Sequence, residues 1–421
     1  MQIKTLADAR LALERYYVQS RPKGQAYSLD HMRQLLSVVG DPQNSLHIIH
    51  VAGTSGKTST AYYASALLQS AGYSVGLTVS PHVVDITDRV QINGAPLDEA
   101  TFCADLEHFL HLVDRSGLTP TYFEVMIAFA FWEFAVKRVD YAVVEVGIGG
   151  LLDMTNVIER KDKVCLITDI GFDHMSILGS TLAEISEQKA GIIQHLNEVC
   201  MFRQSTEIMN SVQQRARLKQ AQLHILDDSD IESLGHLPKF QRRNFSLAVA
   251  AVAIVLQRRE QQLTSEQRLQ ASRVHIPGRM EVCKVGNKTV ILDGAHNEQK
   301  IDALIKGVAE QYPHQEVAAL VAFVDKSDAL ERVESCLNIL RPHINELVVT
   351  EFGGPRDAPY ISVASEIVAA YAKTAGFHSV QANPDPALAF EQLLEMPQQV
   401  VVVTGSFYLL NHIRPLSLEK A

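Results

Sequence analysis

The feature of the sequence that most limits the possible fold is a short apolar run followed by a glycine-containing loop, LHIIHVAGTSGKTSTAYY, at residues 46–63. The run breaks at Gly53, and a helix-compatible segment follows from Lys57. A strand, a glycine turn and a helix N-terminus together bind anions, because main-chain N–H groups and the positive end of the helix dipole face the ligand. The stretch therefore predicts an α/β fold with a phosphate site.

The side chains of this loop have distinct expected roles. Lys57 would reach the outer phosphates of a nucleotide, and the hydroxyl of Thr58 or Ser59 could hold Mg²⁺. The spacing is unusual, since only two residues separate Gly53 from Gly56, whereas a standard Walker A loop has four residues between its glycines. An ordinary strand–helix turn with a chance Gly-Lys-Thr sequence is the alternative interpretation.

Length and composition indicate a globular protein with two domains. A chain of 421 residues exceeds one ordinary hydrophobic core. A hydrophobic content of 47% and a mean hydropathy near zero are typical of soluble globular proteins. The longest apolar stretch, residues 125–136, is too short to span a bilayer, so we expect no membrane association.

Cysteine usage and net charge restrict the compartment and the partners. The five cysteines never form a C-x-x-C pair, which favours a reducing compartment without disulfides, and we expect a cytoplasmic protein. The formal net charge of −10, without any basic run, argues against nucleic acid as a partner. A small anionic substrate remains compatible with this charge, because a local pocket can be positive.

Buried strands alternate with helices along the chain, which is typical of a parallel, doubly wound sheet. The expected strands are 46–52, 73–80, 141–147, 164–170 and 198–202, and the expected helices are 98–116, 122–138, 181–193, 206–220 and 240–260. After Pro277-Gly278 the alternation repeats in miniature without a second phosphate loop. We therefore predict a P-loop domain with a mostly parallel sheet over residues 1–272, and a smaller Rossmann-like α/β domain over residues 273–421 that closes onto it.

Three polar residues follow predicted strands, at the sheet edge where such folds bind ligands. Ser80, Glu145 and His174 supply a hydroxyl, a carboxylate and an imidazole, which phosphate oxygens and water would complete into a Mg²⁺ site. Each residue also has a structural explanation, because an acid at a strand end is often a cap and a lone histidine is often a hydrogen-bonded surface residue. Their convergence beside the glycine loop favours the metal site.

Four further residues have both a functional and a structural interpretation. Lys189 can be a solvated helix lysine, and Arg279 either a surface arginine or a partner for negative charge in a cleft. Asp293 and His296 follow a predicted strand of the second domain and could reach a nucleotide or an incoming nucleophile. Helix capping explains part of this pattern but not the histidine.

With these motifs in order, the chain resembles the folylpolyglutamate synthase/dihydrofolate synthase family within the muramyl-peptide (Mur) ligases. The matching pieces span nearly the whole chain. They are HVAGTSGKTST, SPH at 80–82, DRVQING at 88–94, TYFE at 121–124, EVGIGG to TN at 145–156, DHMSILGSTLAEISEQKAGI at 173–192, FQRRNFSLA at 240–248, PGRME at 277–281, DGAHN at 293–297 and TGSFYLL at 404–410. The SPH, DGAHN and TGSFYL pieces favour the folate branch.

The resemblance implies ATP and two Mg²⁺ ions, with K⁺ as an optional further ion, and it assigns the site residues. The nucleotide would contact Gly53, Thr54, Ser55, Gly56, Lys57, Thr58, Ser59, Asn244, Arg279 and Asp293. The metal would be held by Ser80, Glu145 and His174, helped by a carbamylated Lys189. The pteroate group would contact Leu29, Asp30, Thr121, Tyr122, Phe123, Glu124, Leu152 and Asp153. Glutamate would contact His296, Ser406 and Tyr408, and the residues implied in catalysis are Lys57, Lys189 and His296.

Three departures from the family pattern concern substrate recognition. Leu151 stands where the family commonly has arginine, and the loop reads TSGKTS where folate members usually read TNGKGS or TNGKGT. The segment SLDHMR at 28–33 lacks the glycine usual in the family. None of these departures removes a metal ligand or Lys57.

The implied reaction is ATP-dependent amide formation through an acyl phosphate, adding L-glutamate to dihydropteroate and extending the glutamate tail of folates. The alternatives are a monofunctional folylpolyglutamate synthase or another Mur-type amino-acid ligase, and, from another class, a P-loop NTPase without ligase activity. The partners would be small molecules, namely dihydropteroate, folates and L-glutamate, and the resemblance implies a monomer.

Overall fold

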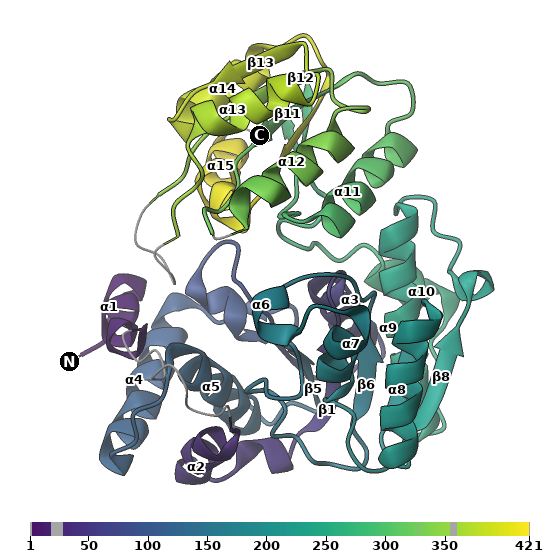
Figure 1. Ribbon diagram of the computed structural model, residues 1–421. Helices are drawn as coiled ribbons and strands as arrows, with labels where there is room; N and C mark the ends of the chain where they lie inside the picture. Colours follow the sequence, from purple (N-terminus) through teal and green to yellow (C-terminus); the bar gives the residue numbers. More distant parts are fainter. Residues whose placement is uncertain (1, 18–27, 327, 354–359, 421) are drawn as a thin grey trace. The chain divides into compact units, whose positions relative to one another are not determined.

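The computed structural model describes residues 2–17, 28–326, 328–353 and 360–420. The chain divides into two compact units, one of residues 1–234 and 241–274 and the other of residues 235–240 and 275–421. Each unit is a sheet with helices packed on it (Figure 1). The predicted fold class, a mostly parallel doubly wound α/β sheet with a second, smaller Rossmann-like unit, is confirmed.

The described part of the first unit contains an eight-stranded sheet in the order β4-β3-β2-β5-β1-β6-β7-β8. In this sheet β3 runs in the opposite direction to the other seven strands. The central strands are buried on both faces of the sheet, which explains why they are continuous apolar runs in the sequence. The strands are β1 His47–Ala52, β2 Val75–Thr78, β3 Gln91–Ile92, β4 Ala95–Pro96, β5 Tyr141–Glu145, β6 Val164–Ile167, β7 Glu198–Phe202 and β8 Gln222–Leu226. Because β1 pairs with β5 and β6, the carboxyl ends of these three strands adjoin.

Helices cover both faces of this sheet. On one face, the helices α1, α2, α4 and α5 pack against Ala142 and Val144 of β5. On the same face, α7 and α8 pack against Ala52 of β1 and Ile167 of β6. Because side chains alternate along a strand, the remaining side chains of these strands point to the opposite face. That face is covered by α3, and α9 and α10 pack beside α3. The helices are α1 Leu6–Tyr17, α2 Asp30–Val38, α3 Lys57–Ser70, α4 Glu99–Ser116, α5 Tyr122–Val136, α6 Met175–Leu178, α7 Leu182–Ala190, α8 Thr206–Leu218, α9 Lys239–Gln257 and α10 Ser265–Ala271.

Local sequence explains several helix starts. Thr121, Thr181 and Thr264 each precede a helix and form a capping box with the Glu or Gln three residues later. The helix that follows Thr121, α5, is apolar on nearly all sides and is mostly buried. Its Trp132, the single tryptophan of the sequence, stacks on Phe129.

The described part of the second unit contains a six-stranded sheet in the order β13-β12-β11-β14-β10-β9, with β9 antiparallel to β10. One apolar cluster joins α11, α12 and α13 to one face, and α14 and α15 contact the other. The strands are β9 Glu281–Val285, β10 Lys288–Leu292, β11 Val317–Val321, β12 Glu346–Val349, β13 Ser379–Ala382 and β14 Val400–Thr404. The helices are α11 Glu298–Gln311, α12 Ala329–Leu340, α13 Ser365–Thr374, α14 Pro386–Glu395 and α15 Phe407–Glu419.

Sequence patterns missed several of these elements. The strands β8, β9 and β13 lie at sheet edges, and each contains exposed or half-exposed residues. Edge strands therefore lack the continuous apolar run that identified the central strands. Helix ends also shift slightly, since the helix predicted over 240–260 spans Lys239–Gln257.

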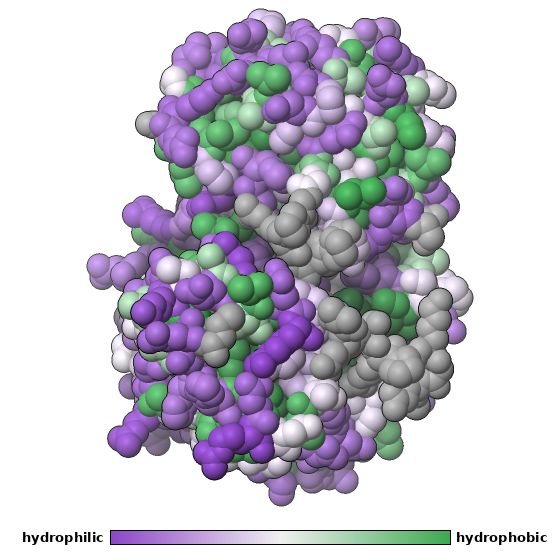
Figure 2. Space-filling model, turned by 90° about the vertical axis from the view of Figure 1, so that its left-hand side faces the viewer, coloured by the Kyte–Doolittle hydropathy of each residue, from purple (hydrophilic) through white to green (hydrophobic). Residues whose placement is uncertain are grey.

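The surface does not present an extended apolar region on the face drawn in Figure 2, where hydrophilic residues predominate and hydrophobic ones form small scattered groups. Among the described residues, no helix combines the length and the apolar character needed to cross a membrane. The five cysteines are buried free thiols.

Candidate functional site

The loop after β1 has a backbone that favours glycine at two positions. Gly53 and Gly56 have φ angles of +148° and +89°, which residues with a Cβ rarely adopt. A Cβ at Gly53 would lie 1.8 Å from Thr168 Oγ1, and one at Gly56 would lie 2.3 Å from Asn244 Oδ1. The loop is therefore packed tightly between the end of β6 and α9, and Asn244 lies directly beside it.

Asp169, which sequence reasoning did not single out, anchors the loop from the β6 side. Its main-chain oxygen accepts the N–H groups of Thr54 and Ser55 at 2.9 and 3.1 Å. Its carboxylate accepts from the Arg243 guanidinium at 3.0 to 3.2 Å. The signal that could have found this pair is the position of Arg243, directly before Asn244 in the FQRRNFSLA stretch.

Two lysine amines meet at one carbonyl of the loop. Lys57 Nζ donates to Gly53 O at 3.1 Å, and Lys189 Nζ, from α7, donates to the same oxygen at 2.9 Å. Lys189 is only 3% exposed. The structure therefore excludes the interpretation of Lys189 as a solvated surface lysine and places its amine against the phosphate loop.

A buried carboxylate adjoins the same loop. Glu145, at the end of β5, is 2% exposed. One of its oxygens accepts from the Thr58 hydroxyl at 2.9 Å, and the other accepts the Ser80 N–H at 3.2 Å. Of the two candidate hydroxyls, Thr58 is thus the one that contacts the predicted metal ligand.

The groups around Glu145 fit a hard cation. A buried carboxylate, the Thr58 hydroxyl beside it and Ser80 at the next strand end are oxygen donors of the kind that Mg²⁺ prefers. Among the described residues, no three His, Cys, Asp or Glu side chains are grouped as a metal cage.

His174 begins α6 with a left-handed backbone, at φ +50°. Its side chain is 36% exposed, and its Nε2 lies 3.7 Å from Asp173 Oδ1. Three residues earlier, Gly171 O accepts the hydroxyl of Thr54 at 3.0 Å. The segment that carries His174 is therefore linked to the glycine loop, and the imidazole is accessible to a ligand.

Some residues predicted to contact pteroate act as internal supports. Glu124 is fully buried, and its carboxylate accepts the N–H and the hydroxyl of Thr121 at 2.7 and 2.8 Å and contacts His31 Nδ1 at 3.0 Å. Burial acts to raise the pKa of Glu124, but the hydrogen bonds from Thr121 and His31 outweigh it and lower that pKa. Leu29 is buried, whereas Asp30 is exposed.

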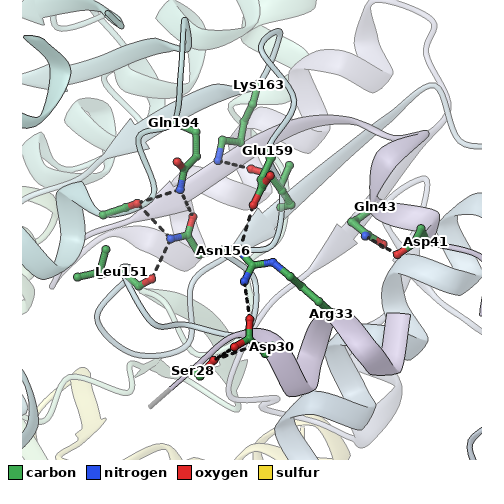
Figure 3. Close-up of polar contacts among 12 residues, drawn as sticks. Ser28, Asp30, Arg33, Asp41, Gln43, Leu151, Asn156, Glu159, Lys163 and Gln194 are labelled. Atoms are coloured by element: carbon green, nitrogen blue, oxygen red, sulfur yellow. Dashed lines mark hydrogen bonds and ion pairs between the residues drawn. The ribbon is translucent and has the colours of Figure 1, made fainter. Parts of the chain in front are cut away.

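The neighbouring α2 is tied to the loop after β5 by exposed charges. Arg33 pairs with Asp30 at 3.2 Å and with Glu159 at 3.0 Å (Figure 3). All three side chains are largely solvated, so these pairs contribute little stability.

Aromatic residues at the start of α5 line the same region. The Arg89 guanidinium lies 5.4 Å from the centre of the Tyr122 ring. Phe123 packs on Gly147, where a Cβ would lie 2.4 Å from Phe123 Cζ. The loop after Glu145 is therefore in contact with the start of α5.

Leu152 and Asp153 behave differently although they are neighbours. Leu152 is 40% exposed, whereas Asp153 is buried. The Asp153 carboxylate accepts the N–H groups of Ile148 and Thr155 at 2.9 and 3.0 Å, and burial raises its pKa. Asp153 thus shapes the loop, and Leu152 is the side chain of this pair that a ligand can reach.

In the second unit, the equivalent strand end is that of β10. Asp293 is buried, its carboxylate accepts the N–H groups of Met280 and Ala295 at 2.8 Å each, and burial raises its pKa. His296 Nδ1 lies 2.8 Å from Gly294 O, and its Nε2 lies 3.0 Å from Lys300 Nζ. Because a carbonyl only accepts and an ammonium only donates, this geometry fits a neutral imidazole that is protonated at Nδ1.

The remaining predicted residues of the second unit surround this strand end. The Arg279 guanidinium lies over the Phe407 ring, 4.0 Å from its centre. Ser406 caps α15 by accepting the Tyr408 N–H at 3.1 Å, and the Tyr408 ring stacks on Phe352. The TGSFYL loop joins the DGAHN loop directly, since the N–H of residue 405 donates to the oxygen of residue 295 at 2.8 Å.

Glu281, in the PGRME motif, is a buried anchor that sequence reasoning did not single out. Its carboxylate accepts the Gly278 N–H at 2.8 Å and the Arg414 Nε–H at 2.9 and 3.0 Å. Burial acts to raise the pKa of Glu281, but hydrogen bonds from His275 and Arg414 outweigh it and hold that pKa at about 2. The carboxylate therefore fixes the loop that carries Arg279.

The structure thus forms two groups of predicted residues. In the first unit, the glycine loop meets Ser80, Glu145, Lys189 and Asn244, and this group can bind a polyphosphate together with a cation. In the second unit, Asp293 and His296 share one strand end with the loop of Ser406 and Tyr408.

Comparison with known proteins identifies the family. The Mur ligase middle domain matches residues 51–282, and the Mur ligase glutamate ligase domain matches residues 278–407. The chain is 29% identical to the dihydrofolate synthase/folylpolyglutamate synthase of Bacillus subtilis, over 95% of this chain and 97% of that protein. It is 30% identical to the dihydrofolate synthetase of Saccharomyces cerevisiae, over 91% and 96% respectively.

Comparison of the three-dimensional structure with solved structures indicates the same family relationship. The crystal structure of the bifunctional folylpolyglutamate synthase/dihydrofolate synthase of Yersinia pestis, complexed with AMPPNP and a Mn ion, matches with a TM-score of 0.81 and 26% identity over 98% of each chain. The middle-domain match covers more than half of this chain, and the yeast relative matches nearly end to end. The chain therefore belongs to the Mur ligase family, in its dihydrofolate synthase/folylpolyglutamate synthase branch.

Proposed function

We propose that the protein is an ATP-dependent ligase that adds L-glutamate to dihydropteroate and extends the glutamate tail of folates. The observation that carries this proposal is the contact network at the glycine loop. There one carbonyl accepts from Lys57 and Lys189, and the Thr58 hydroxyl contacts the buried Glu145. The relatives named for both activities, and the relative that binds AMPPNP and Mn, support the nucleotide and a divalent cation.

The first unit, proposed to extend over residues 1–272, would bind the nucleotide phosphates. Lys57 would neutralise their charge, and the main-chain N–H groups at the start of α3 would point at them. Asn244, packed on Gly56, is placed beside the same loop. The proposed ATP contacts of this unit are Gly53, Thr54, Ser55, Gly56, Lys57, Thr58, Ser59 and Asn244.

Mg²⁺ fits the donor set, and Ser80, Glu145 and His174 would hold it, with two ions as the family resemblance implies. When bound, the cation would neutralise charge on the phosphates. Lys189 is proposed to be carbamylated, which converts its amine into a further carboxylate at the loop. K⁺ remains an optional additional ion.

The pteroate group is proposed to lie at the start of α5. The proposed contacts are Leu29, Asp30, Thr121, Tyr122, Phe123, Glu124, Leu152 and Asp153. Among these, Leu152 and Asp30 are the exposed members, whereas Glu124 and Asp153 would act by holding the others in place.

The second unit, proposed to extend over residues 273–421, would bind glutamate through His296, Ser406 and Tyr408, in agreement with its match to the glutamate ligase domain. Arg279 and Asp293 are proposed to contact the nucleotide. From the family resemblance we further propose a monomer that acts in the cytoplasm.

The reaction would proceed in two balanced steps. A carboxylate oxygen of the acceptor attacks the γ-phosphorus, the bond to the bridging oxygen breaks, and ADP leaves an acyl phosphate behind. The amine of glutamate then attacks the acyl carbon, loses a proton and expels phosphate. Positioning and charge neutralisation by Lys57 lower the first barrier, and the neutral His296 is the proposed acceptor of the proton.

A second candidate is a monofunctional folylpolyglutamate synthase or another Mur-type amino-acid ligase. Leu151 favours it, because this residue stands beside the proposed pteroate contacts where the family commonly has arginine. An uncharged side chain there would alter the contacts with the pteroate group, on which recognition of dihydropteroate, an acceptor without a glutamate tail, depends most.

The test is ADP release with ATP, Mg²⁺ and L-glutamate, comparing dihydropteroate, tetrahydrofolate and no acceptor, with products identified by mass. Release with both acceptors and a glutamylated product is the expected result. Release with tetrahydrofolate alone would establish the monofunctional enzyme. Release without any acceptor would indicate a plain NTPase and contradict the proposal.

A further inference from the structure

A lysine that the proposed reaction does not use is fully buried beneath the active-site helix α7. Lys163, drawn in Figure 3, lies directly before β6 and is 0% exposed. Its Nζ donates to Ile158 O and Ile192 O at 2.8 Å each. Burial lowers its pKa to about 8. A lysine is almost never buried to this extent unless its donors are satisfied, so its position requires an explanation.

One acceptor of Lys163, Ile192 O, lies just after the C-terminal end of α7. Ile192 follows α7, the helix that carries Lys189, and the last carbonyls of a helix have no intrahelical donor. Gly191 O accepts from Asn156 Nδ2 at 3.1 Å and from Arg215 at 3.2 Å. The turn after α7 is therefore fixed by side chains from three separate elements.

Asn156 also ties this turn to the loop after Glu145. Its Nδ2 donates to Leu151 O at 3.0 Å (Figure 3). The Leu151 N–H donates to Gln188 O, within α7, at 2.7 Å. The packing is tight, since a Cβ at Gly191 would lie 2.3 Å from Leu151 Cα. The end of α7 therefore cannot shift without moving the loop that follows β5.

We infer that Asn156 and Lys163 are positioning residues that fix the end of α7 so that the Lys189 amine reaches the phosphate loop. Lys189 is the residue before the last of α7, and its Nζ contacts Gly53 O at 2.9 Å. A displacement of the helix end therefore moves the amine away from the loop. The part of the inference that concerns turnover rests on the proposed function.

The expected consequence is a loss of turnover without a matching loss of binding. A misplacement of about 1 Å by a distant substitution can cost about 100-fold in rate. We expect Asn156→Leu and Lys163→Met to lower kcat by about tenfold or more, with an unchanged KM for glutamate. Lys161→Met, which changes an exposed lysine two residues from Lys163, is the matched control and should leave kcat unchanged.

A second readout reports the position of Lys189 without any need for activity. Trace acetylation with acetic anhydride in a buffer free of CO₂, in which Lys189 carries a free amine, measures by peptide mass spectrometry the reactivity of Lys189 relative to the exposed Lys161. Both variants should raise this ratio several-fold at a temperature at which circular dichroism shows them folded. If Lys163→Met does not fold, Asn156→Leu carries the test, because it leaves the two hydrogen bonds of Lys163 in place.

The outcomes separate this inference from the proposed function. An unchanged labelling ratio and an unchanged kcat in folded variants would overturn it and leave both residues with a purely structural role. A raised ratio with an unchanged kcat would also overturn it, because the position of Lys189 would then not affect turnover. If the wild-type protein makes no glutamylated product, the proposed function fails, and the labelling ratio alone decides the positioning role.

Discussion

The two units of the molecule share a local arrangement, a central strand that leads through a short loop into a helix, but they begin that helix differently. In the first unit α3 follows Gly56, which has no side chain with which to cap it. In the second unit α11 follows Asn297, whose side-chain oxygen accepts the Lys300 N–H at 3.0 Å. The start of α3 thus has no side-chain cap, whereas the start of α11 is capped by the Asn297 side chain.

The difference predicts how each unit recognises its ligand. A helix start without a side-chain cap directs its N–H donors at an external anion, which suits a phosphate. A capped start has already used one of these donors, so we expect recognition there to depend on side chains such as His296 and Lys300. The same local arrangement would then serve main-chain recognition in one unit and side-chain recognition in the other.

The largest expected effect is that of Lys57→Ala, which removes the loop lysine that is proposed to neutralise the charge of the phosphates. Loss of a donor that stabilises developing charge costs about 100- to 1,000-fold in rate, so ADP release should fall by at least about 100-fold. Circular dichroism and thermal unfolding should be unchanged, because the hydrogen bond of the Lys57 amine to Gly53 O lies within its own loop. Lys161→Ala is the matched control, and normal turnover in folded Lys57→Ala would contradict the proposed role of Lys57 in neutralising the phosphate charge.

The next largest effect tests the anchor of the second unit. Glu281→Gln leaves the Arg414 guanidinium without a charged partner, which should lower the free energy of unfolding by about 3 kcal/mol at neutral pH. The folded-state pKa of about 2 lies below the unfolded value of about 4.3, so this contribution is present above the unfolded pKa and is lost as the pH falls toward 2. Urea unfolding of the wild type and the variant should therefore converge at acid pH, and a constant offset would contradict the assignment.

Two glycine substitutions test whether the tight packing of the glycine loop in the first unit shapes its phosphate site. Gly56→Ala and Gly72→Ala place a Cβ on backbones of similar φ, +89° and +91°, each at a strain of about 1–2 kcal/mol. Only at Gly56 does that Cβ meet another group, Asn244 Oδ1 at 2.3 Å. We expect Gly56→Ala alone to weaken AMPPNP binding, by at least about tenfold in calorimetry, through displacement of the loop. Equal affinities in the two variants would show that the close packing of Asn244 does not shape the phosphate site.

The smallest expected effect concerns the capped helix. Asn297→Ala removes the cap of α11 and should lower the free energy of unfolding by about 1 kcal/mol. AMPPNP affinity should not change, since the cap serves the helix and not the nucleotide. Asn297→Asp should retain most of the stability because its carboxylate can accept the same N–H, and an equal loss in both variants would show that the cap is not what stabilises this helix start.

The local features of the fold were predictable because they depend on neighbouring residues. The glycine loop is identified by its own sequence, and the central strands by continuous apolar runs that suit burial on both faces. The edge strands were not predictable in this way, because β8 and β9 contain exposed residues whose pairing partners lie elsewhere in the chain.

The site residues that the sequence concealed are those defined by long-range contacts. Lys163 lies in the sequence ERKDK, which resembles a solvated charged turn, yet it is buried because Ile192 supplies a carbonyl 29 residues later. Asp169 acts through a main-chain oxygen, and no side-chain pattern predicts that contact. Resemblance to a family could assign Lys189, whereas residue spacing alone favoured a surface lysine.

The placement of Trp132 gives the molecule a built-in optical probe for one unit. The ring lies in α5 of the first unit among Phe109 and Phe129, and the sequence contains no second tryptophan. Tryptophan fluorescence therefore follows the packing of the first unit alone, whereas far-ultraviolet circular dichroism follows the helices of both. Two midpoints in one denaturant titration would show that the units melt in separate steps, and coincident midpoints would show that they melt as one cooperative body.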